Sequence, residues 1–198
     1  MILWINGTFG AGKTTVAYEL HRRIKHSFVY DPERFGYVLM KNVPQSISKG
    51  DFQDYPLWRE ANYKLLKQIS EEYDGIIIVP MTLTNKDYFY EIISKLTKNG
   101  IEVNHFTLSA FKQTIDQRLR RRFEGMNSWA YQQMDERMKS LADPMFMEHI
   151  QTDNMSIDEV VETIAELALI KLLPDNRSKL RKSVDRLRVT FKEINIFK

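Results

Sequence analysis

The chain has 198 residues, of which 43% are hydrophobic and 28% charged, with a net charge of +3 and no cysteine. A chain of this length can bury one substantial core, so we expect a single domain with at most a short appendage. The lack of cysteine excludes disulfides and thiolate metal sites. Neither a signal peptide nor a run as long as a membrane span is present, so we expect a cytoplasmic protein.

The excess of basic charge belongs to the C-terminal part of the chain. From Lys171 to Lys198, nine Lys and Arg stand against three Asp and Glu, so residues 1–170 carry a small negative balance. A groove for nucleic acid would need a basic body. We therefore expect no nucleic-acid partner.

The N-terminal segment joins an apolar run to a glycine-rich motif. Residues 2–5 are apolar, the sequence from Gly7 reads G-T-F-G-A-G-K-T, and a helical pattern follows. In a strand-loop-helix context, such a loop directs its N–H groups at phosphate oxygens. Lys13 is expected to reach the β- and γ-phosphates of ATP, and the Thr14 hydroxyl to ligate Mg²⁺. The residues predicted to bind the nucleotide are Gly7, Thr8, Phe9, Gly10, Ala11, Gly12, Lys13, Thr14 and Thr15.

The rest of the body alternates between strand-like and helix-like segments. Further strands are expected at 27–31, 75–79, 101–108 and 148–152, and further helices at 56–73, 87–98, 111–123, 129–141 and 156–170. A loop-rich stretch is expected between the second strand and residue 56. The alternation predicts an α/β three-layer sandwich over residues 1–173, with a five-stranded parallel sheet and a helical lid at about 118–140. All strands would then end at one edge, beside the glycine-rich loop.

Asp31 ends the second predicted strand, directly before Pro32. Its carboxylate would face the γ-phosphate, where it could accept a proton from a substrate hydroxyl or hold a Mg²⁺-bound water. The alternative is a local cap of the turn at Asp31-Pro32. The third strand ends in Val79-Pro80-Met81 without a carboxylate, which argues against a motor ATPase, and the absence of a guanine-reading N-K-x-D motif argues against a GTPase.

Residues 117–125 contain four arginines. Arg118 and Arg122 fall on one face of the predicted helix, and Gly125 could act as a hinge. Cationic side chains on a mobile lid can neutralise the charge of a transferring phosphoryl group. We predict that Arg118 and Arg122 are catalytic and treat Arg137 as a weaker candidate. The alternative is a solvated basic helix face.

Phe52, Tyr55 and Trp58 form an aromatic cluster beside Arg59. Flat aromatic surfaces suit a nucleobase or a sugar ring, and an arginine suits a phosphate or a carboxylate. We predict that these four residues, with Met81 at the end of the third strand, bind a small nucleoside-like substrate. The alternative is that aromatic residues at this spacing simply belong to the core.

The tail, residues 174–198, predicts a basic amphipathic helix. Leu180, Val184, Leu187 and Phe191 form one apolar stripe with Arg and Lys on its flanks. Such a helix can lie weakly and reversibly in an anionic membrane interface, which predicts peripheral membrane contact through 175–198. Docking of the stripe on the body of the protein or on a second subunit is an equal alternative.

Seven motifs spread along the chain carry a family resemblance. They are W-I-N-G-T-F-G-A-G-K-T at 4–14, E-L-H-R-R at 19–23, V-Y-D-P-E at 29–33, D-F-Q-D-Y-P-L-W-R at 51–59, I-V-P-M-T at 78–82, N-S-W-A at 127–130 and H-I-Q-T-D-N at 149–154. With them the chain resembles, over essentially its whole length, the bacterial tunicamycin-resistance protein family of P-loop ATP-binding proteins. The resemblance implies a P-loop kinase-like fold, ATP and Mg²⁺ as cofactors, and protection against a nucleoside antibiotic.

The resemblance also implies roles for single residues. In related nucleoside monophosphate kinases and small antibiotic phosphotransferases, a carboxylate at the end of the second strand can serve as base, which matches Asp31. Lid arginines follow the fourth strand, which matches Arg118 and Arg122. The resemblance further implies membrane association through the C-terminal segment. We therefore predict ATP-dependent phosphorylation of the drug or of a related uridine-like molecule. The alternatives are ATP-dependent sequestration of the drug at the membrane without chemistry, and a housekeeping nucleotide or sugar kinase.

Overall fold

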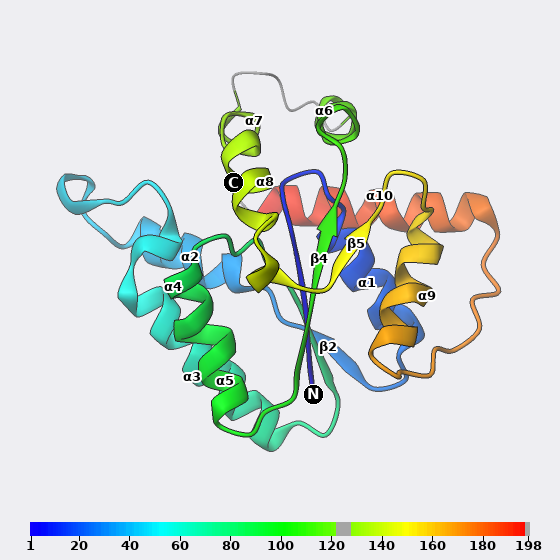
Figure 1. Cartoon of the computed structure of the whole chain (residues 1–198), viewed down its shortest axis with the longest axis horizontal. Coiled ribbons are helices and arrows are strands. Elements are labelled where there is room, and N and C mark those ends of the chain that lie inside the picture. The colour runs from blue at the N-terminus through cyan, green and yellow to red at the C-terminus, as the bar shows by residue number, and fades with distance from the viewer. Residues whose placement is uncertain (122–127, 197–198) are drawn as a thin grey trace.

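The structure, a computed structural model, describes residues 1–121 and 128–196. At its centre lies a five-stranded, fully parallel sheet in the order β2-β3-β1-β4-β5, as predicted. Its strands are β1 (Ile2–Gly7), β2 (Ser27–Val29), β3 (Ile76–Pro80), β4 (Val103–Ser109) and β5 (His149–Gln151). The middle strand, β1, is buried along its whole length, so the loop that follows it leaves the sheet at its centre (Figure 1).

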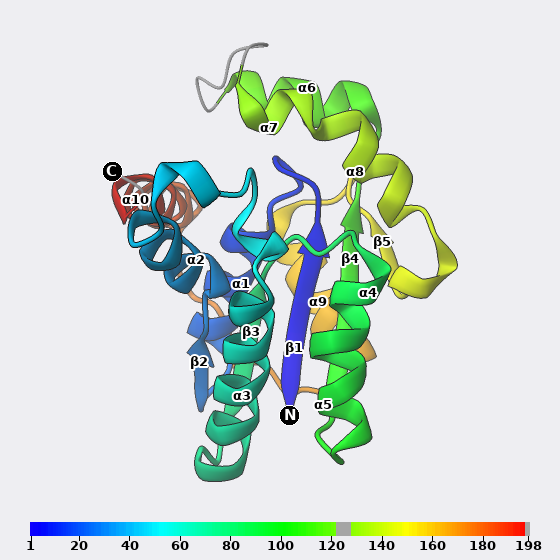
Figure 2. The ribbon, with the colours of Figure 1, turned by 90° about the vertical axis from the view of Figure 1, so that its left-hand side faces the viewer.

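Helices cover both faces of the sheet and give the predicted three layers (Figure 2). One apolar core lies between the sheet and the helices α1 (Lys13–Arg23), α6 (Lys112–Arg120) and α9 (Ile157–Leu167). The other lies against α3 (Pro56–Glu72) and a continuous helical stretch made of α4 (Lys86–Phe89), a π-helical turn (Tyr90–Ser94) and α5 (Lys95–Lys98). Leu3 and Ile5 belong to the first core, and Ile2 and Trp4 to the second. Burial of both faces explains why residues 2–5 read as an unbroken apolar run.

The lid lies across the C-terminal ends of the strands, where α6, α7 (Trp129–Gln132) and α8 (Met134–Leu141) meet (Figure 2). A single helix was predicted over 129–141, but the structure divides it at Gln133. Ser128 caps α7, because its side chain accepts a hydrogen bond from the N–H of Tyr131. Arg122, one of the two predicted catalytic arginines of the lid, lies outside the described residues.

The prediction of a loop-rich stretch after the second strand was wrong, because a helix, α2 (Pro32–Lys41), begins there. Asp31 caps this helix: its Oδ1 accepts a hydrogen bond from the N–H of Glu33 at 3.0 Å, and Pro32 fills the first turn. An Asp followed by Pro is a helix-start signal. The chain then continues through two 3₁₀ turns, Gln45–Ile47 and Phe52–Asp54, and a third one, Pro144–Phe146, precedes β5.

Asn6 ties the end of β1 to the chain that leaves β3. Its Oδ1 accepts hydrogen bonds from the N–H groups of Gly7 and Leu83 at 2.8 and 2.9 Å, and its Nδ2 donates to the carbonyl of Leu83 at 2.8 Å. The same nitrogen lies 3.1 Å from Nε2 of His105, whose Nδ1 lies 2.5 Å from the carbonyl of Met147. Burial lowers the pKa of His105 to about 4, so the ring is neutral and can donate through Nδ1 while it accepts through Nε2.

Replacing Asn6 with Ala is expected to lower the free energy of unfolding by about 2–4 kcal/mol, because the backbone groups of Gly7 and Leu83 lose buried partners. In a chain of this size that corresponds to a fall in Tm of roughly 5–15 °C in scanning calorimetry. Asn104→Ala on β4 is the control, since Asn104 bonds only partly exposed groups of Met1 and Glu102. An equal fall in both variants would contradict the assignment of Asn6.

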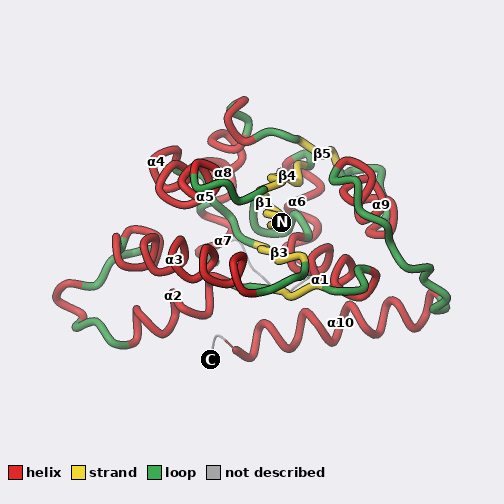
Figure 3. Tube along the Cα trace, turned by 90° about the horizontal axis from the view of Figure 1, so that it is seen from below, coloured by secondary structure: helices red, strands yellow, loops and turns green. Residues whose placement is uncertain are grey.

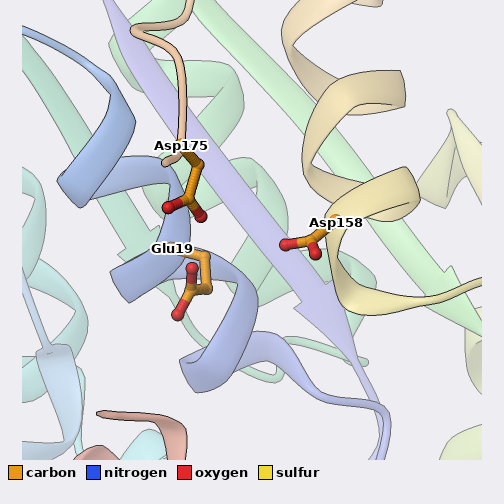
Figure 4. A group of neighbouring side chains, drawn as sticks. All are labelled: Glu19, Asp158 and Asp175. Carbon is orange, nitrogen blue, oxygen red and sulfur yellow. The ribbon is translucent and has the colours of Figure 1, made fainter. Parts of the chain in front are cut away.

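The basic tail forms α10 (Lys179–Ile196), which runs along the outside of α1 (Figure 3). Its polar side is held by ion pairs that join the cations Arg177, Lys182 and Arg186 to the carboxylates Glu19, Asp158 and Asp175. Figure 4 shows the three carboxylates turned toward one another, with oxygens within 4.8 Å. Arg177 also pairs with Asp185 of α10 at 3.0 Å. Because each of these carboxylates is paired with a cation, the group is an ion-pair network that joins the tail to α1 and α9. We call it the tail network.

The apolar stripe of α10 points away from the body. Leu180, Val184 and Leu187 are 79%, 38% and 57% exposed, and the side chain of Phe191 lies outside the described part. Docking of these three residues on the body, one of the two alternatives, is therefore wrong. Within residues 1–121 and 128–196, none of the helices combines the length and apolar character needed to span a bilayer.

Acid is expected to release α10. Hydrogen bonds from Arg177 hold the pKa of Asp175 well below its usual range. A carboxyl group whose pKa in the folded state lies below its unfolded value, about 3.9, contributes stability that is fully present above that value and is lost as the pH falls through the folded pKa. Hydrogen-exchange protection factors of α10 should hold from about pH 8 to pH 5 and then fall progressively as the pH drops below about 4, before those of β1. Equal loss of protection in both elements would contradict the role of the tail network.

Candidate functional site

The loop between β1 and α1 has the conformation of a phosphate-binding loop. Gly12 has a φ of 100°, in a region that other residues rarely adopt, and a Cβ on Gly7 would lie 2.7 Å from the carbonyl oxygen of Leu108. The first helix begins at Lys13, directly after the loop. Its free N–H groups and the positive end of its dipole therefore face the loop, which makes an anion site.

Lys13 is held at this loop. Its side chain is only 8% exposed, and its Nζ donates to the carbonyl of Thr8 at 2.9 Å, with the ring of Phe9 5.6 Å away. The next residues, Thr14 and Thr15, lie in the first turn of α1. A hydroxyl at this position fits Mg²⁺, which takes one or two protein oxygens and keeps several waters. The first turn of α1 has no acidic side chain, so its candidate oxygen ligands are the hydroxyls of Thr14 and Thr15, of which Thr14 is the predicted one.

A small pocket adjoins the loop on the side of α2. Phe52 and Met81, both predicted to contact a substrate, line it. Phe9 of the loop and Trp129 of α7 complete its apolar wall, and its charged residues are Glu33, Asp51 and Arg137. We call it the Arg137 pocket. Four distant segments of the chain thus meet beside the phosphate-binding loop.

Arg137 is the buried cation of this pocket. It is 7% exposed, and its Nη2 donates to Oδ2 of Asp51 at 2.9 Å. Its guanidinium lies 4.9 Å from the ring centroids of both Phe9 and Trp129, within the range of cation–π attraction. Its Nε is buried and has no hydrogen-bond partner among the described residues. A buried donor without a partner is costly, so this atom suits an acceptor group on a ligand.

Burial and three nearby carboxylates act on Tyr37 of the pocket wall. Burial raises the pKa of Tyr37, which lines the pocket, and the charges of Glu33, Asp31 and Asp51 raise it further. The phenol therefore stays protonated at neutral pH and keeps its O–H as a donor. Asp31 itself is turned to α2, where it caps the helix and its Oδ2 lies 3.6 Å from Nε of Arg34.

Trp58 and Arg59 lie behind the Arg137 pocket. The fully buried Trp58 donates through Nε1 to the carbonyl of Pro32 at 3.1 Å. Arg59 donates to the carbonyl of Gln53 at 2.6 Å and pairs with Glu91 at 2.7 Å. Both side chains thus fix α3 to the segments that carry the pocket wall.

Tyr55 is also used locally, because its hydroxyl accepts a hydrogen bond from the N–H of Lys49 at 2.8 Å. Among the described residues, the pocket wall includes none of Tyr55, Trp58 and Arg59. Contact of these three residues with a substrate stays a prediction, and the core alternative describes Trp58 well.

Arg118 contacts Thr152, the residue after β5, and does not belong to the described wall of the Arg137 pocket. Its Nη1 and Nη2 donate to Oγ1 and the carbonyl of Thr152, each at 3.0 Å. Thr152 leads into residues 153–155, which we expect to border the nucleotide base. The base of the lid also touches the phosphate-binding loop, because a Cβ on Gly10 would lie 3.2 Å from Cγ of Leu119. A catalytic role for Arg118 stays a prediction.

The sequence reasoning missed Glu33, Asp51 and Trp129 and placed Arg137 below Arg118. A signal for the first three existed, since each lies in a motif that carries the family resemblance, at 29–33, 51–59 and 127–130. Arg137 lies in none of these motifs. Its placement depends on the break at Gln133, which separates α8 from α7.

Comparison with solved structures identifies a relative that is similar over most of the chain. Neither a protein-family model nor a curated protein matches the chain. The solved tunicamycin resistance protein of Deinococcus radiodurans is similar over 88% of this chain and 98% of its own, with 34% identity and a TM-score of 0.76.

Two kinases share the fold at lower identity. APS kinase of Mycobacterium tuberculosis is 17% identical, with a TM-score of 0.54 over 85% of this chain and 96% of its own. Shikimate kinase of Bacteroides thetaiotaomicron is 18% identical, with a TM-score of 0.55 over 86% of this chain and 99% of its own. The chain has the P-loop kinase fold and belongs to the tunicamycin resistance protein family.

Proposed function

We propose that the protein confers resistance to tunicamycin by transferring the γ-phosphoryl group of ATP to a hydroxyl of the drug or of a related uridine-like molecule. The observation that supports this proposal most directly is that one residue, Phe9, belongs both to the phosphate-binding loop and to the wall of the Arg137 pocket. An acceptor in that pocket would lie beside the phosphates of ATP. Phosphoryl transfer needs mainly such positioning and electrostatic stabilisation.

In the proposed reaction the acceptor oxygen bonds to the γ-phosphorus, while the bond from that phosphorus to the β–γ bridging oxygen breaks. The products are the phosphorylated acceptor and ADP. Lys13 and the N–H groups of the loop stabilise the charge on the phosphates. Mg²⁺, when bound, adds to this neutralisation, and Thr14 would hold it together with water. Arg137 holds and orients the acceptor through its Nε, which has no hydrogen-bond partner within residues 1–121 and 128–196.

The proton of the acceptor hydroxyl passes to a carboxylate. Asp31 is the predicted base and partner of the Mg²⁺-bound water, and Glu33, two residues further on, lines the pocket. Asp31→Asn keeps the helix cap, because Asn caps as well as Asp, and Glu33→Gln keeps the shape of the side chain. Loss of the base should lower kcat by roughly 10²–10⁴-fold. Losses below tenfold in both variants would contradict transfer of the proton to this turn.

A comparison of substrates separates resistance from a housekeeping role. We expect ADP release that depends on tunicamycin and exceeds the release with free uridine nucleotides and common sugars. Much faster turnover of one of these metabolites would favour a housekeeping nucleotide or sugar kinase instead.

The outward stripe of α10 favours a second candidate function, the sequestration of the drug at a membrane without chemistry. Leu180 and Leu187 are exposed beside Arg181 and Arg188, an arrangement that suits anionic lipid. This candidate predicts that the protein co-sediments with vesicles containing anionic lipid and that Leu180→Ser with Leu187→Ser abolishes both sedimentation and resistance. Resistance that survives in the double variant would exclude it.

A further inference from the structure

A polar pocket lies at the opposite end of α1 from the phosphate-binding loop. Its volume is about 510 Å³. Its wall consists of Arg22, Arg23, Pro174, Asp175, Asn176 and Arg177. Because Lys13 and Arg22 lie near opposite ends of α1, they are about 14 Å apart along the helix axis. We call this pocket the arginine pocket and treat it as separate from the nucleotide site.

Two segments of the chain meet at the arginine pocket. One is the last turn of α1, and the other is the stretch 174–177, which leads from α9 into α10. They are joined at Arg23, whose carbonyl accepts a hydrogen bond from the N–H of Leu173 at 2.7 Å and whose Nε donates to the carbonyl of Leu173 at 3.0 Å. A ligand in the pocket would therefore contact both α1 and the start of the tail.

The carboxylates in and around this pocket are engaged with cations. Asp175, the one acidic residue of the wall, pairs with Arg177 and Lys182, and its side chain is only 7% exposed. Three further carboxylates lie just outside the wall and pair with its arginines: Glu19, Glu162 and Asp185. The wall thus offers a ligand little free negative charge.

The donors of the wall are only partly used by the protein. Within residues 1–121 and 128–196, Arg22 makes no hydrogen bond, and its Nη1 lies 4.0 Å from the nearest paired carboxylate, that of Asp185. In the same part of the chain, Nη2 of Arg23 and the amide of the exposed Asn176 have no hydrogen-bond partner. Arg177 differs, because its Nε, Nη1 and Nη2 each donate to a carboxylate. The free donors indicate a ligand rich in acceptor oxygens.

The composition of the wall excludes several other ligands. Pro174 is its one apolar residue among those described, and no aromatic ring is present to stack on a nucleobase. Arginines repel a metal cation. A single carboxylate would gain little beside side chains as exposed as Arg22. Phosphate oxygens match the planar fork of a guanidinium, and several linked phosphates can use adjacent arginines together.

We propose that the arginine pocket binds a ligand with two or more linked phosphate groups, and that this ligand ties the start of the tail to the end of α1. Its oxygens accept hydrogen bonds from Arg22, Arg23 and Asn176, and Arg177 adds positive charge. A free polyphosphate and a multiply phosphorylated lipid headgroup present the same chemistry to these donors. The inference does not depend on the proposed reaction.

Calorimetric titration with tripolyphosphate tests the site while the phosphate-binding loop is occupied. The protein is first loaded with Mg²⁺ and a non-hydrolysable ATP analogue, so that the loop does not compete for the probe. We expect one binding event per chain, and binding of inorganic phosphate at least about tenfold weaker, because fewer charge-assisted hydrogen bonds form. Absence of saturable binding by tripolyphosphate would overturn the inference.

A substitution of Arg22 gives the decisive variant, because this exposed side chain makes no hydrogen bond that the fold needs. Arg22→Gln should raise the Kd for tripolyphosphate about tenfold, and Arg22→Lys, which keeps the charge but loses the planar fork, by less. Arg188→Gln makes the same change at an exposed position of α10 outside the pocket and should keep the wild-type Kd. Equal Kd values in Arg22→Gln and Arg188→Gln would overturn the inference.

Hydrogen exchange tests whether the ligand joins the two segments. Because release of α10 from α1 would break the site, tripolyphosphate at 100 times its Kd should raise the protection factors of α10 by about 100-fold. The same concentration should have a much smaller effect in Arg22→Gln. Unchanged protection of α10 in the saturated wild-type protein would contradict the joining role.

Vesicles distinguish the two sources of the phosphate. The protein is sedimented with phosphatidylcholine vesicles that contain or lack a lipid with a bisphosphorylated headgroup. Sedimentation that requires this lipid and is lost in Arg22→Gln would assign the pocket to a lipid headgroup. Binding of tripolyphosphate without such sedimentation would assign it to a free polyphosphate.

Discussion

Replacement of Lys13 by Met is expected to lower kcat for phosphoryl transfer by about 10²–10³-fold and to raise the KM for ATP. The ammonium group donates to the carbonyl of Thr8 in the phosphate-binding loop, and Lys13 as a whole is 8% exposed, so the charge acts in a largely buried site. Removal of one such preorganised charge typically costs a factor of this size. A coupled assay of ADP release measures both constants.

The matched control for Lys13 is Lys25, an exposed lysine that follows α1. Lys25→Met makes the same chemical change and should leave kcat and both KM values within about twofold of wild type. Circular dichroism should show the same helix content in both variants. A fall in kcat of less than tenfold in Lys13→Met would contradict a catalytic role for Lys13.

The second large effect is expected at Arg137. Arg137→Met should lower kcat/KM for the acceptor by about 10²-fold and leave the KM for ATP within about twofold, because the side chain lines the acceptor side of the loop. Arg137→Lys keeps the charge but loses the planar fork and the stacking between Phe9 and Trp129, so we expect an intermediate loss. Steady-state kinetics with each substrate varied in turn separates these effects.

Two controls distinguish recognition from folding at this site. Arg137→Met leaves Asp51 without its partner, and the double variant with Asp51→Asn removes that charge. Arg120→Met changes an exposed arginine of α6 that pairs with Asp116 and should have no kinetic effect. Recovery of acceptor kcat/KM to the wild-type value in the double variant would show that Arg137 acts only by balancing Asp51.

The phosphate-binding loop could be predicted residue by residue because its chemistry is local. The nine consecutive residues from Gly7 to Thr15 supply the turn, the anion site and the start of the helix, so the motif specifies its own structure without residues from elsewhere in the chain. The parallel sheet followed equally well from the alternation of apolar strands and amphipathic helices. The helix α2 was missed because an aromatic-rich sequence followed by turn-forming residues resembles a loop. The pair Asp31-Pro32, a helix-start signal, did indicate where the helix begins.

The Arg137 pocket could not be predicted in the same way, because no segment contains it. Phe9, Glu33, Asp51 and Arg137 come from four parts of the chain and meet only after the sheet has formed. The aromatic pattern around Trp58 fits a core and a substrate wall equally well, and only the burial of Trp58 shows its place in the core.

The orientation of α10 could not be predicted from its own sequence either. The sequence predicts the apolar stripe and its basic flanks, but which side faces the protein depends on distant partners. Glu19 and Asp158 engage the basic side, so the stripe through Leu180 and Leu187 turns outward. Charge complementarity between helices far apart in sequence therefore decides the orientation.

Transfer of phosphate to the drug itself is the most direct test of the proposed function. Tunicamycin is incubated with MgATP and either wild-type protein or Lys13→Met, and the drug is then examined by mass spectrometry while ADP is quantified. The wild type should yield a drug heavier by one phosphoryl group and an equal amount of ADP, and the variant should yield neither at the same time point. Drug of unchanged mass after incubation with the wild-type protein would contradict the proposed phosphotransferase.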